Sequence, residues 1–255
     1  MIKVFENNQE PLVSVIIATY NSDLYLEQCI NSILNQTYSK FELLIIDGGS
    51  TDKTVSIIKK YESVIKYWIS EPDKGVYDAW NKAIDKSSGS WLTFIGSDDI
   101  FYPNALELYV KHIISYDNSK ELEFVSSKID LVDNDLALVK IVGEPWNWHS
   151  FKQSMVTWHV GSFHSRQLFD KYGLFDSSYK ISGDYEFLLR PKDLLNASYI
   201  NVRTVKMRNG GLSNNRLIDA SNETYNAKIK NGLLSPFLGN LLRYIDRARL
   251  IFRSI

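Results

Sequence analysis

The sequence predicts an α/β protein in which helices flank a mostly parallel central sheet, and three observations lead to this fold class. Short apolar runs alternate with amphipathic stretches through the first half of the chain, as in βαβ units. Several of these runs are apolar at nearly every position, which is typical of strands buried on both faces. The chain has 255 residues, of which 44% are hydrophobic, so it can bury roughly 70–75% of its unfolded surface without disulfides or structural metals.

The first half divides into four strands, each followed by a helix. We expect Thr51 to cap the second helix, with Asp52 in its first turn. Each strand is followed by polar or glycine residues, which places them at the carboxyl edge of the sheet, where open α/β sheets bind ligands. The predicted strands are Val13–Ala18, Phe41–Ile46, Lys66–Ile69 and Trp91–Ile95, and the predicted helices span 22–35, 51–61 and 77–87, with a fourth opening at Pro103.

After about residue 115 the elements become shorter and the pattern predicts a more irregular half. Strands are expected over 124–127, 137–142 and 199–202, and helices are expected from Ser165 and over Asp184–Arg190. Neither an internal repeat nor a Pro/Gly linker interrupts the sequence. We therefore predict a single domain over residues 1–235, with halves at about 11–115 and 116–215, followed by a C-terminal amphipathic helix over 236–255.

Charge and cysteine content exclude several classes of function. The 29 Lys and Arg residues against 30 Asp and Glu give a formal net charge of −1, unlike a dedicated nucleic-acid-binding protein. The single cysteine, Cys29, lies at helical spacing with Leu26, Ile30 and Ile33 and is expected in the core. The N-terminal residues do not resemble a signal peptide and no apolar run approaches 18 residues, so we expect a cytoplasmic protein.

Two adjacent carboxylates follow the fourth predicted strand, in the sequence Gly96-Ser97-Asp98-Asp99. Carboxylate oxygens suit Mg²⁺ or Mn²⁺, which keep open positions for the phosphate oxygens of a nucleotide. The alternative is that one of the two acids only starts a turn or caps the next helix. The pair alone does not decide between these interpretations.

Polar residues after the first two strands are candidates for nucleotide recognition. Asp47 can accept from a base imide or a ribose hydroxyl, or it can form the turn before Gly48-Gly49. Thr19-Tyr20-Asn21 offers an aromatic face and polar groups to a base, or Asn21 caps the next helix while Tyr20 packs.

The segment Glu71-Pro72-Asp73-Lys74-Gly75 precedes a predicted helix. Lys74 can pair with a phosphate near the helix N-terminus, and Asp73 or Asp78 can bind a sugar hydroxyl. A solvated surface turn is the alternative.

In the second half, Asp184 opens an amphipathic helix after Gly183. It is either the N-cap of that helix or a general base presented toward the cleft. The loop residues Trp146, Trp148, Trp158, His149 and His159 offer flat faces for an acceptor sugar, with core packing as the alternative.

Five segments in order resemble family 2 glycosyltransferases with the GT-A fold. They are VSVIIATYN, IDGGSTDKT, EPDKGVYDAWN, FIGSDD followed by Pro103, and FHSRQLFDKYGLFDSSYKISGDYEFLLR. The resemblance covers about residues 11–215 and is closest to bacterial members that extend lipid-linked oligosaccharides for O-antigen or capsule.

This resemblance implies a nucleotide-sugar-binding first half, an acceptor and catalytic-base second half, and a nucleoside that is usually uridine. Asp98 and Asp99 match the family's metal-binding Asp-x-Asp region, although its first acid is Gly96 here, so Asp98 is the expected direct ligand of Mn²⁺ or Mg²⁺. The residues expected to bind the donor are Thr19, Tyr20, Asn21, Asp47, Asp73, Lys74, Ser97 and Asp98.

Asp184 matches the family's catalytic base, although the Glu that often precedes it is Gly183 here. The resemblance implies an inverting displacement that moves one hexose or N-acetylhexosamine from a nucleotide sugar to a sugar hydroxyl of a lipid-linked acceptor. The Gln-x-x-Arg-Trp motif of processive synthases is absent, so one sugar per encounter is expected.

The C-terminal segment is both amphipathic and basic. Four arginines and one aspartate accompany apolar residues at helical spacing, namely Leu238, Leu241, Leu242, Ile245, Ala248 and Phe252. Such a helix can lie on an anionic membrane surface as a peripheral contact, or dock on protein.

Of two other classes of function, the sequence disfavours one and leaves the other open. A dinucleotide-dependent oxidoreductase is disfavoured because the first turn lacks Gly-x-Gly-x-x-Gly. A non-catalytic carbohydrate-binding or scaffold protein remains the alternative, since Gly96 and Gly183 each replace an acid.

Overall fold

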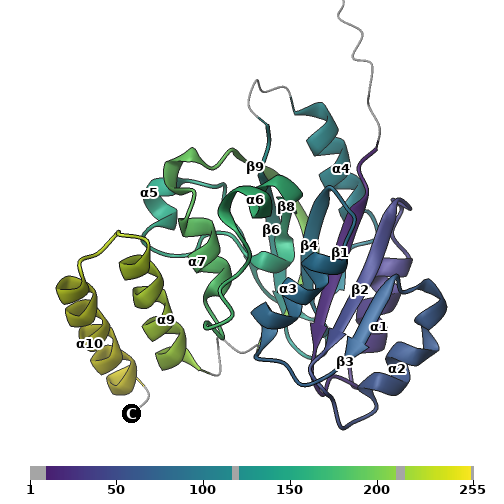
Figure 1. Ribbon diagram of the computed structural model, residues 1–255, viewed down its shortest axis with the longest axis horizontal. Coiled ribbons are helices and arrows are strands. Elements are labelled where there is room, and N and C mark those ends of the chain that lie inside the picture. Colours follow the sequence, from purple (N-terminus) through teal and green to yellow (C-terminus); the bar gives the residue numbers. More distant parts are fainter. Residues whose placement is uncertain (1–9, 117–120, 211–215, 254–255) are drawn as a thin grey trace, which may run out of the picture.

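The computed structural model describes residues 10–116, 121–210 and 216–253, with only the backbone for 250–253. Strands of this part of the chain form one sheet in the order β3-β2-β1-β4-β8-β6-β9-β5, with β7 paired to β6 (Figure 1). The strands are β1 Val13–Thr19, β2 Phe41–Asp47, β3 Tyr67–Ser70, β4 Trp91–Gly96, β5 Ile100–Phe101, β6 Phe124–Val132, β7 Leu138–Val142, β8 Ser162–Ser165 and β9 Ala197–Arg208.

Helices pack on both faces of this sheet and extend to one side of it. The α-helices are α1 Leu26–Leu34, α2 Thr54–Lys60, α3 Val76–Lys86, α4 Ala105–Ser115, α5 Trp148–Phe151, α6 Arg166–Tyr172, α7 Gly183–Leu189, α9 Leu217–Lys230 and α10 Pro236–Arg253. Short 3-10 turns are η1 Glu62–Val64, η2 His159–Gly161 and η3 Lys192–Leu194. In the described residues, none of these helices is long and apolar enough to cross a membrane.

The first half confirms the four predicted strand and helix pairs, and β3, β2, β1 and β4 are all parallel. The prediction that Thr51 caps the second helix is wrong, because α2 begins at Thr54. The Asp52 carboxylate accepts the Thr54 N–H at 2.9 Å, and the Thr51 N–H donates to the side chain of Asn21 instead. The loop that precedes α2 is therefore tied to the loop after β1.

The second half contributes strands to the same sheet and makes it mixed. β8 is antiparallel to both β4 and β6, whereas β9 runs parallel to β6 and antiparallel to β5. β6 and β9 are longer than predicted, and the sequence analysis did not identify β5, β8, α5 or α9. β8 reads SFHS and β5 has two residues, so neither has an apolar run long enough to be recognised.

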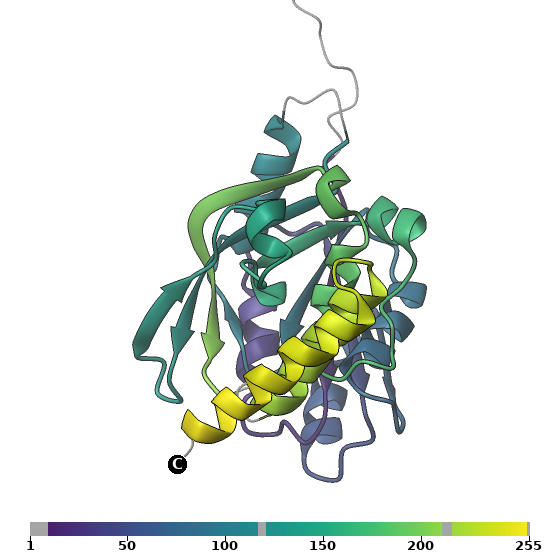
Figure 2. The same cartoon turned by 90° about the vertical axis from the view of Figure 1, so that its left-hand side faces the viewer.

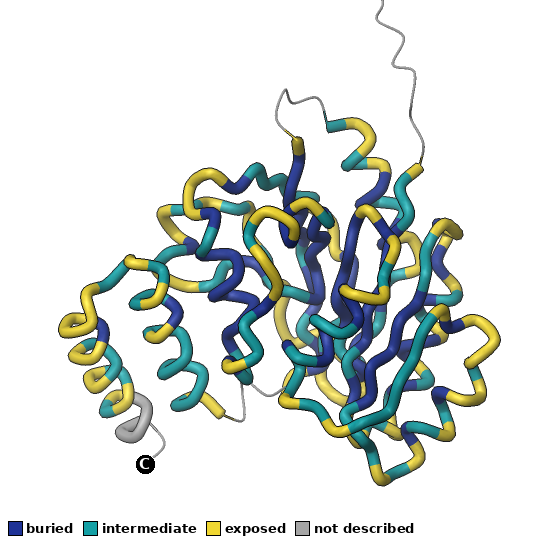
Figure 3. The backbone as a smooth tube through the Cα atoms, in the orientation of Figure 1, coloured by how far each residue is buried: buried dark blue, intermediate teal, exposed yellow. Residues whose placement is uncertain are grey.

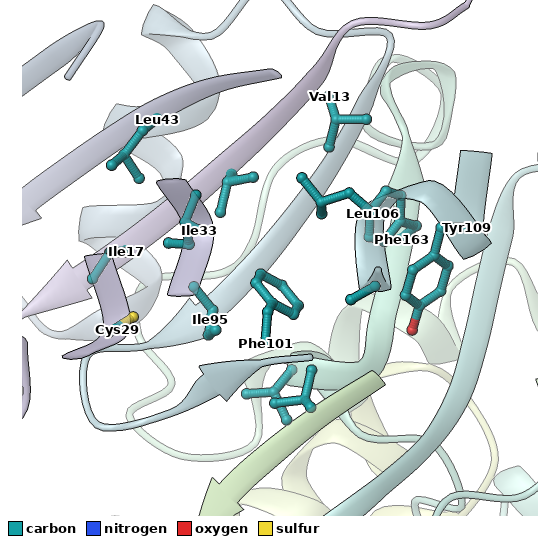
Figure 4. Packing of buried hydrophobic residues seen from close by; sticks show 14 of the residues in the cluster. Val13, Ile17, Cys29, Ile33, Leu43, Ile95, Phe101, Leu106, Tyr109 and Phe163 are labelled. Carbon is teal, nitrogen blue, oxygen red and sulfur yellow. The ribbon is translucent and has the colours of Figure 1, made fainter. Parts of the chain in front are cut away.

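Two apolar cores lie on opposite faces of the sheet, because successive strand side chains alternate between faces. Val13 and Ile17 of β1 face the core that α1, α2 and α4 cover, while Ile16 faces the core under α3, α6 and α7. Figure 4 shows part of the first core, including Cys29, which is fully buried as predicted. The parallel strands are thus fixed from both sides, and their carboxyl ends form a rigid edge.

The last two helices lie outside this layered body. Residues of α7 lie against α9, and α10 packs along α9 as the outermost element (Figure 2). The core around α7 reaches α9 through the buried Ala227, while much of the outer side of α10 is exposed (Figure 3). The segment after β9 therefore has one helix that supports the body and one that faces outward.

Candidate active site

Strand register brings the predicted residues of the first half to one edge of the sheet. Thr19 at the end of β1 stands opposite Asp47 of β2, and Asp47 stands opposite Ser70 of β3. On the other side of β1, Ala18 stands opposite Gly96 of β4. The chain order reverses between β1 and β4, and open α/β sheets bind ligands at such a switch point.

Asp47 organises the loop that follows its own strand. The side chain is fully buried, and Oδ2 accepts from the N–H groups of Gly49 and Ser50 and from the hydroxyl of Ser70, at 3.2, 2.9 and 2.6 Å. Among the described residues, Oδ1 accepts a single hydrogen bond, from the Ser50 hydroxyl at 2.5 Å. Asp47 therefore forms the turn, and its Oδ1 has the capacity to accept a second hydrogen bond.

The loop after β1 combines a buried hydroxyl, an exposed ring and a strained residue. The Thr19 hydroxyl is buried and has no hydrogen-bond partner among the described residues. The Tyr20 side chain is 62% exposed. Asn21 has a φ of 48° and is held by Ser50, whose hydroxyl accepts the Asn21 N–H at 2.7 Å. Asn21 is thus fixed to the β2 loop instead of capping α1, which begins at Leu26.

The loop before α3 lies against the loop after β2. A Cβ at Gly48 would lie 3.0 Å from Oδ2 of Asp73, so a glycine here lets the Asp73 carboxylate approach the backbone. Oδ1 of Asp73 accepts the Gly75 N–H at 2.7 Å. Lys74 is exposed, and its backbone N–H donates to Asp78. Asp73 is therefore positioned at the edge, whereas the Lys74 side chain extends into solvent.

The two acids after β4 converge on the space beside Gly96. A Cβ at Gly96 would lie 2.6 Å from Oδ2 of Asp99 and 2.9 Å from Oδ1 of Asp98. Asp99 is 3% exposed, and burial together with the charge of Asp98 raises the pKa of its carboxyl well above the usual range. The Ser97 hydroxyl donates to that of Ser22 at 2.9 Å, which joins this loop to the β1 loop.

Arg208, at the end of β9, holds the acidic loop and was missed by the sequence analysis. Its backbone N–H donates to Oδ1 of Asp99 at 3.0 Å, and its guanidinium donates to the backbone carbonyl of Asp98 and to Gln28. The guanidinium also lies over the Tyr25 ring, 4.0 Å from the centroid. Asp99 is thus an anchor for β9, while the carboxylate of Asp98 remains for a ligand.

The acid pair can supply part of a metal coordination shell. Two carboxylates that repel each other in a shared space are hard oxygen ligands for Mg²⁺ or Mn²⁺. Within the described ranges, no group of three or more His, Cys, Asp or Glu side chains is arranged to hold a metal ion. The other ligands of such an ion would have to be phosphate oxygens or water molecules, as is usual for Mg²⁺ in nucleotide sites.

Asp184 lies at the start of α7 and is 8% exposed. Its Oδ1 accepts from the Tyr77 hydroxyl at 3.0 Å and from the Tyr185 N–H at 2.9 Å. Its Oδ2 lies 3.5 Å from Nδ1 of His159, whose ring packs on Trp80. One carboxylate oxygen is therefore fixed by the fold, and the other faces an imidazole that is partly open to solvent.

Tyr77 fills the space that a side chain at position 183 would need. A Cβ at Gly183 would lie 2.7 Å from the Tyr77 ring, so a tyrosine of α3 occupies the space beside the acid. The Tyr77 hydroxyl also lies 2.7 Å from the Ile181 carbonyl. Gly183 was the one sequence signal that pointed to this arrangement, but it did not identify the partner.

Glu223 of α9 holds the segment that leads into α7. Its carboxylate accepts the N–H groups of Lys180, Ile181 and Ser182 at 2.8 to 2.9 Å. The ammonium of Lys180 donates in turn to the backbone carbonyl of Lys74. The structure thereby connects the loop before α3 to the segment that carries Asp184.

Most of the aromatic loop contributes to packing. Trp146 packs at a tilt against Phe151, with 4.3 Å between ring centroids, and edge-on against Phe124. Trp148 and Trp158 are partly buried against the two cores. His149 is exposed. Of these five residues, His159 is the one that reaches Asp184.

Comparison with known proteins establishes the family of this chain. A family model described as glycosyl transferase family 2 matches residues 14–183. The chain is also 32% identical over 219 residues to a PGL/p-HBAD biosynthesis glycosyltransferase of Mycobacterium bovis, with 80% of each chain covered. The chain belongs to glycosyl transferase family 2. The five sequence segments therefore identified the correct family.

Solved structures of other glycosyltransferases share the fold of this family 2 chain. The Staphylococcus aureus TarS structure of residues 1–349 in complex with UDP-GlcNAc has a TM-score of 0.66 at 17% identity, covering 85% of this chain and 66% of that one. The chain spans only 39% of a longer TarS structure. The Pyrobaculum calidifontis mannosyltransferase PcManGT, in complex with GDP-Man and Mn²⁺, has a TM-score of 0.66 at 17% identity, covering 93% and 70%. The GT-A fold predicted from the sequence is confirmed.

Proposed function

We propose that this glycosyltransferase moves one hexose or N-acetylhexosamine, with inversion, from a nucleotide sugar to a sugar hydroxyl of a lipid-linked saccharide. The observation that carries the proposal is the position of Asp184, a nearly buried carboxylate with one oxygen fixed by Tyr77 and the other available. Lys180 and Tyr77 connect this carboxylate to the loop beside Asp73. Residues 11–115 are assigned to the donor and 116–215 to the acceptor and the base.

In the proposed reaction, Asp184 accepts the proton of the acceptor hydroxyl. The hydroxyl oxygen forms a bond to the anomeric carbon as the bond from that carbon to the diphosphate breaks, which inverts the configuration. Because Tyr77 and the Tyr185 N–H occupy Oδ1, Oδ2 is the oxygen that receives the proton. A positioned base of this kind contributes typically ~10²–10⁴-fold to the rate.

The acid pair fits a divalent cation such as Mn²⁺ or Mg²⁺. The Asp98 carboxylate would bind this ion directly, with the buried Asp99 carboxylate next to it. Such an ion, when bound, offsets the negative charge that grows on the departing nucleoside diphosphate. Arg208 keeps the loop in place by donating to the backbone of Asp98.

We propose a uridine nucleotide as the donor. Tyr20 offers an exposed ring to the base, and the candidate polar contacts are Asp47 Oδ1 and the Thr19 hydroxyl, which are buried at the strand ends beside it. The TarS structure in complex with UDP-GlcNAc and the PcManGT structure with GDP-Man and Mn²⁺ support a nucleotide sugar and a divalent ion. O-antigen, capsule or another exopolysaccharide is the product class, and the cytoplasm is the location.

A donor panel tests this function. Protein, Mn²⁺ or Mg²⁺ and a synthetic N-acetylhexosamine diphosphate lipid are incubated with UDP-, GDP- and dTDP-sugars, and products are read by mass spectrometry. We expect a mass gain of one sugar that EDTA and Asp98→Ala abolish and that Asp135→Asn, an exposed acid in the β6–β7 turn, retains. Absence of both transfer and calorimetric nucleotide binding would favour the non-catalytic carbohydrate-binding or scaffold alternative.

A further inference from the structure

We propose that the outward face of α10 docks on an anionic membrane surface. The proposal deepens the proposed function, because it rests on an acceptor that carries a lipid. The sequence left two interpretations of this helix open, a membrane contact and a contact with protein. The structure shows which side of the helix each set of residues occupies.

The inward side of α10 packs on α9 and is mostly polar or small, with Leu242 as its partly buried apolar residue. A Cβ at Gly239 would lie 2.5 Å from the Ile229 side chain, so the glycine lets the two helices approach closely. The Tyr225 hydroxyl donates to Asp246 at 2.5 Å, and Arg243 donates to Asn226 at 3.1 Å. These contacts hold the helix without using most of its apolar residues.

The outward side carries those apolar residues, at spacings of three and four. Phe237 is 81% exposed and Tyr244 is 74% exposed, and they continue into Leu241 at 47% and Ile245 at 36%. Large contiguous apolar patches that are exposed on a protein usually mark interaction sites. A helix that turns its polar side to its own protein and its apolar side outward has its binding face unpartnered within the described chain.

Arginines border this apolar strip. Arg247 and Arg249 are exposed, whereas Arg243 is half-buried and donates to Asn226 and Asn240. Asp246 accepts from Tyr225 on the inward side and pairs with Arg249 at 3.3 Å. A basic border around an apolar face is the pattern of interfacial helices that bind anionic lipid.

Charge favours a membrane over a second copy of the chain. In a two-fold dimer the same patch meets itself, so the arginines that border one strip would lie near those of the other. Anionic headgroups, by contrast, complement these arginines while acyl chains receive Phe237 and Leu241. We therefore commit to the membrane as the occupant of this face.

Docking through α10 would also place the catalytic segment near the lipid. α10 packs on α9, and Glu223 of α9 binds the N–H groups of the segment before α7. The route from the membrane face to Asp184 thus passes through two helices in direct contact. A lipid-linked acceptor held in the same membrane would be delivered to this side of the protein.

Vesicle co-sedimentation of the full chain tests the proposal. Wild type, Phe237→Asp with Leu241→Asp, and Arg247→Glu are mixed with vesicles of phosphatidylcholine alone or with 30% phosphatidylglycerol. We expect binding to the anionic vesicles only, reduced more than tenfold by the double variant and severalfold by Arg247→Glu. Val139→Asp, which replaces an exposed valine on β7, is the matched control and should bind like wild type.

Equal sedimentation of wild type and the double variant, or no sedimentation at all, would overturn the proposal. A concentration-dependent dimer in light scattering that the double variant abolishes would instead assign the face to a second copy. Transfer to a short, water-soluble acceptor analogue should be unchanged in the double variant. That assay separates the two proposals, since its failure in wild type would count against the proposed function alone.

Discussion

The loops that follow β1 and β2 and the segment that carries Asp184 are held in place by different kinds of contact. In the first region, backbone N–H groups and short side chains of adjacent loops bind one another, as around Asp47. In the second, side chains from α3, η2 and α9 converge on α7 across large sequence separations, as Tyr77 does on Asp184. The first region can form as the parallel sheet forms, whereas the second requires the complete fold.

The largest effect is expected from removing the proposed base, which lies in the second region. Asp184→Asn should reduce kcat by ~10²–10⁴-fold, because an amide cannot take up the proton of the acceptor hydroxyl. The fold and the strand-end edge should stay intact. Steady-state transfer with a short acceptor measures this. Activity within a few-fold of wild type would mean that another residue is the base.

A smaller effect is expected from disrupting the hydrogen bonds around Asp47 in the first region. Asp47→Asn places an amide NH₂ among the four N–H and O–H groups that donate to the carboxylate. We expect the free energy of unfolding to fall by about 1–3 kcal/mol, the cost of leaving buried donors unsatisfied. Urea unfolding measures it, and Asp135→Asn should leave the midpoint unchanged.

The stability cost of an added Cβ should differ between Gly183 and Gly96. Gly183→Ala drives a Cβ into the packed Tyr77 ring, whereas Gly96→Ala meets the ends of two carboxylate side chains. Overpacking typically costs about 1–3 kcal/mol, and we expect that cost for Gly183→Ala. Gly96→Ala should cost less, because carboxylates can rotate. Thermal unfolding of both variants checks the order, and the reverse order would contradict the tight fit at Tyr77.

The strands of the first half and the meeting of their end residues could be predicted because local patterns determine them. Strand-end residues such as Thr19 and Asp47 meet wherever parallel strands pair in register. Thr51 was predicted as a cap from local preference alone, but its N–H donates to Oδ1 of Asn21 and α2 begins at Thr54.

The supports of Asp184 could not be predicted, because no local pattern marks them. Tyr77 is 107 residues away and reads as an ordinary core residue of a helix. Glu223 lies in α9, whose sequence LIDASNETYNAKIK has weak apolar periodicity. Arg208 likewise contacts the acidic loop from 109 or more residues away. Such contacts follow from the order of the sheet strands and from the packing of α7 and α9.

A pH experiment tests the packing around the buried His164 of β8. His164 lies among Phe94, Phe124 and Phe169, and burial lowers the pKa of its imidazole to about 3. Between pH 6.5 and about 3 the unfolded chain binds a proton at this histidine and the folded chain does not. Stability should therefore fall with decreasing pH by about 1.4 kcal/mol per unit from this group alone.

His164→Gln should flatten that slope in urea unfolding between pH 7 and 5. The control is His149→Gln, at an exposed position, which should retain the wild-type slope. An unchanged slope in His164→Gln would show that the imidazole is not kept neutral by its surroundings.

The smallest expected effect concerns the orientation of Asp184. Tyr77→Phe keeps the ring against Gly183 and removes one hydrogen bond, worth about 0.5–1.5 kcal/mol. We expect kcat to fall up to about tenfold while KM for the donor is unchanged. A rise in donor KM with constant kcat would place Tyr77 in donor binding.

The central claim is that the strand-end edge binds the nucleotide and the Asp184 segment performs the chemistry. Calorimetric titration of UDP with Mn²⁺ into wild type, Asp184→Asn and Asp47→Asn tests it most directly. We predict the same Kd for wild type and Asp184→Asn, and binding weaker by about tenfold or more for Asp47→Asn. Loss of UDP binding in Asp184→Asn, with wild-type affinity in Asp47→Asn, would contradict it.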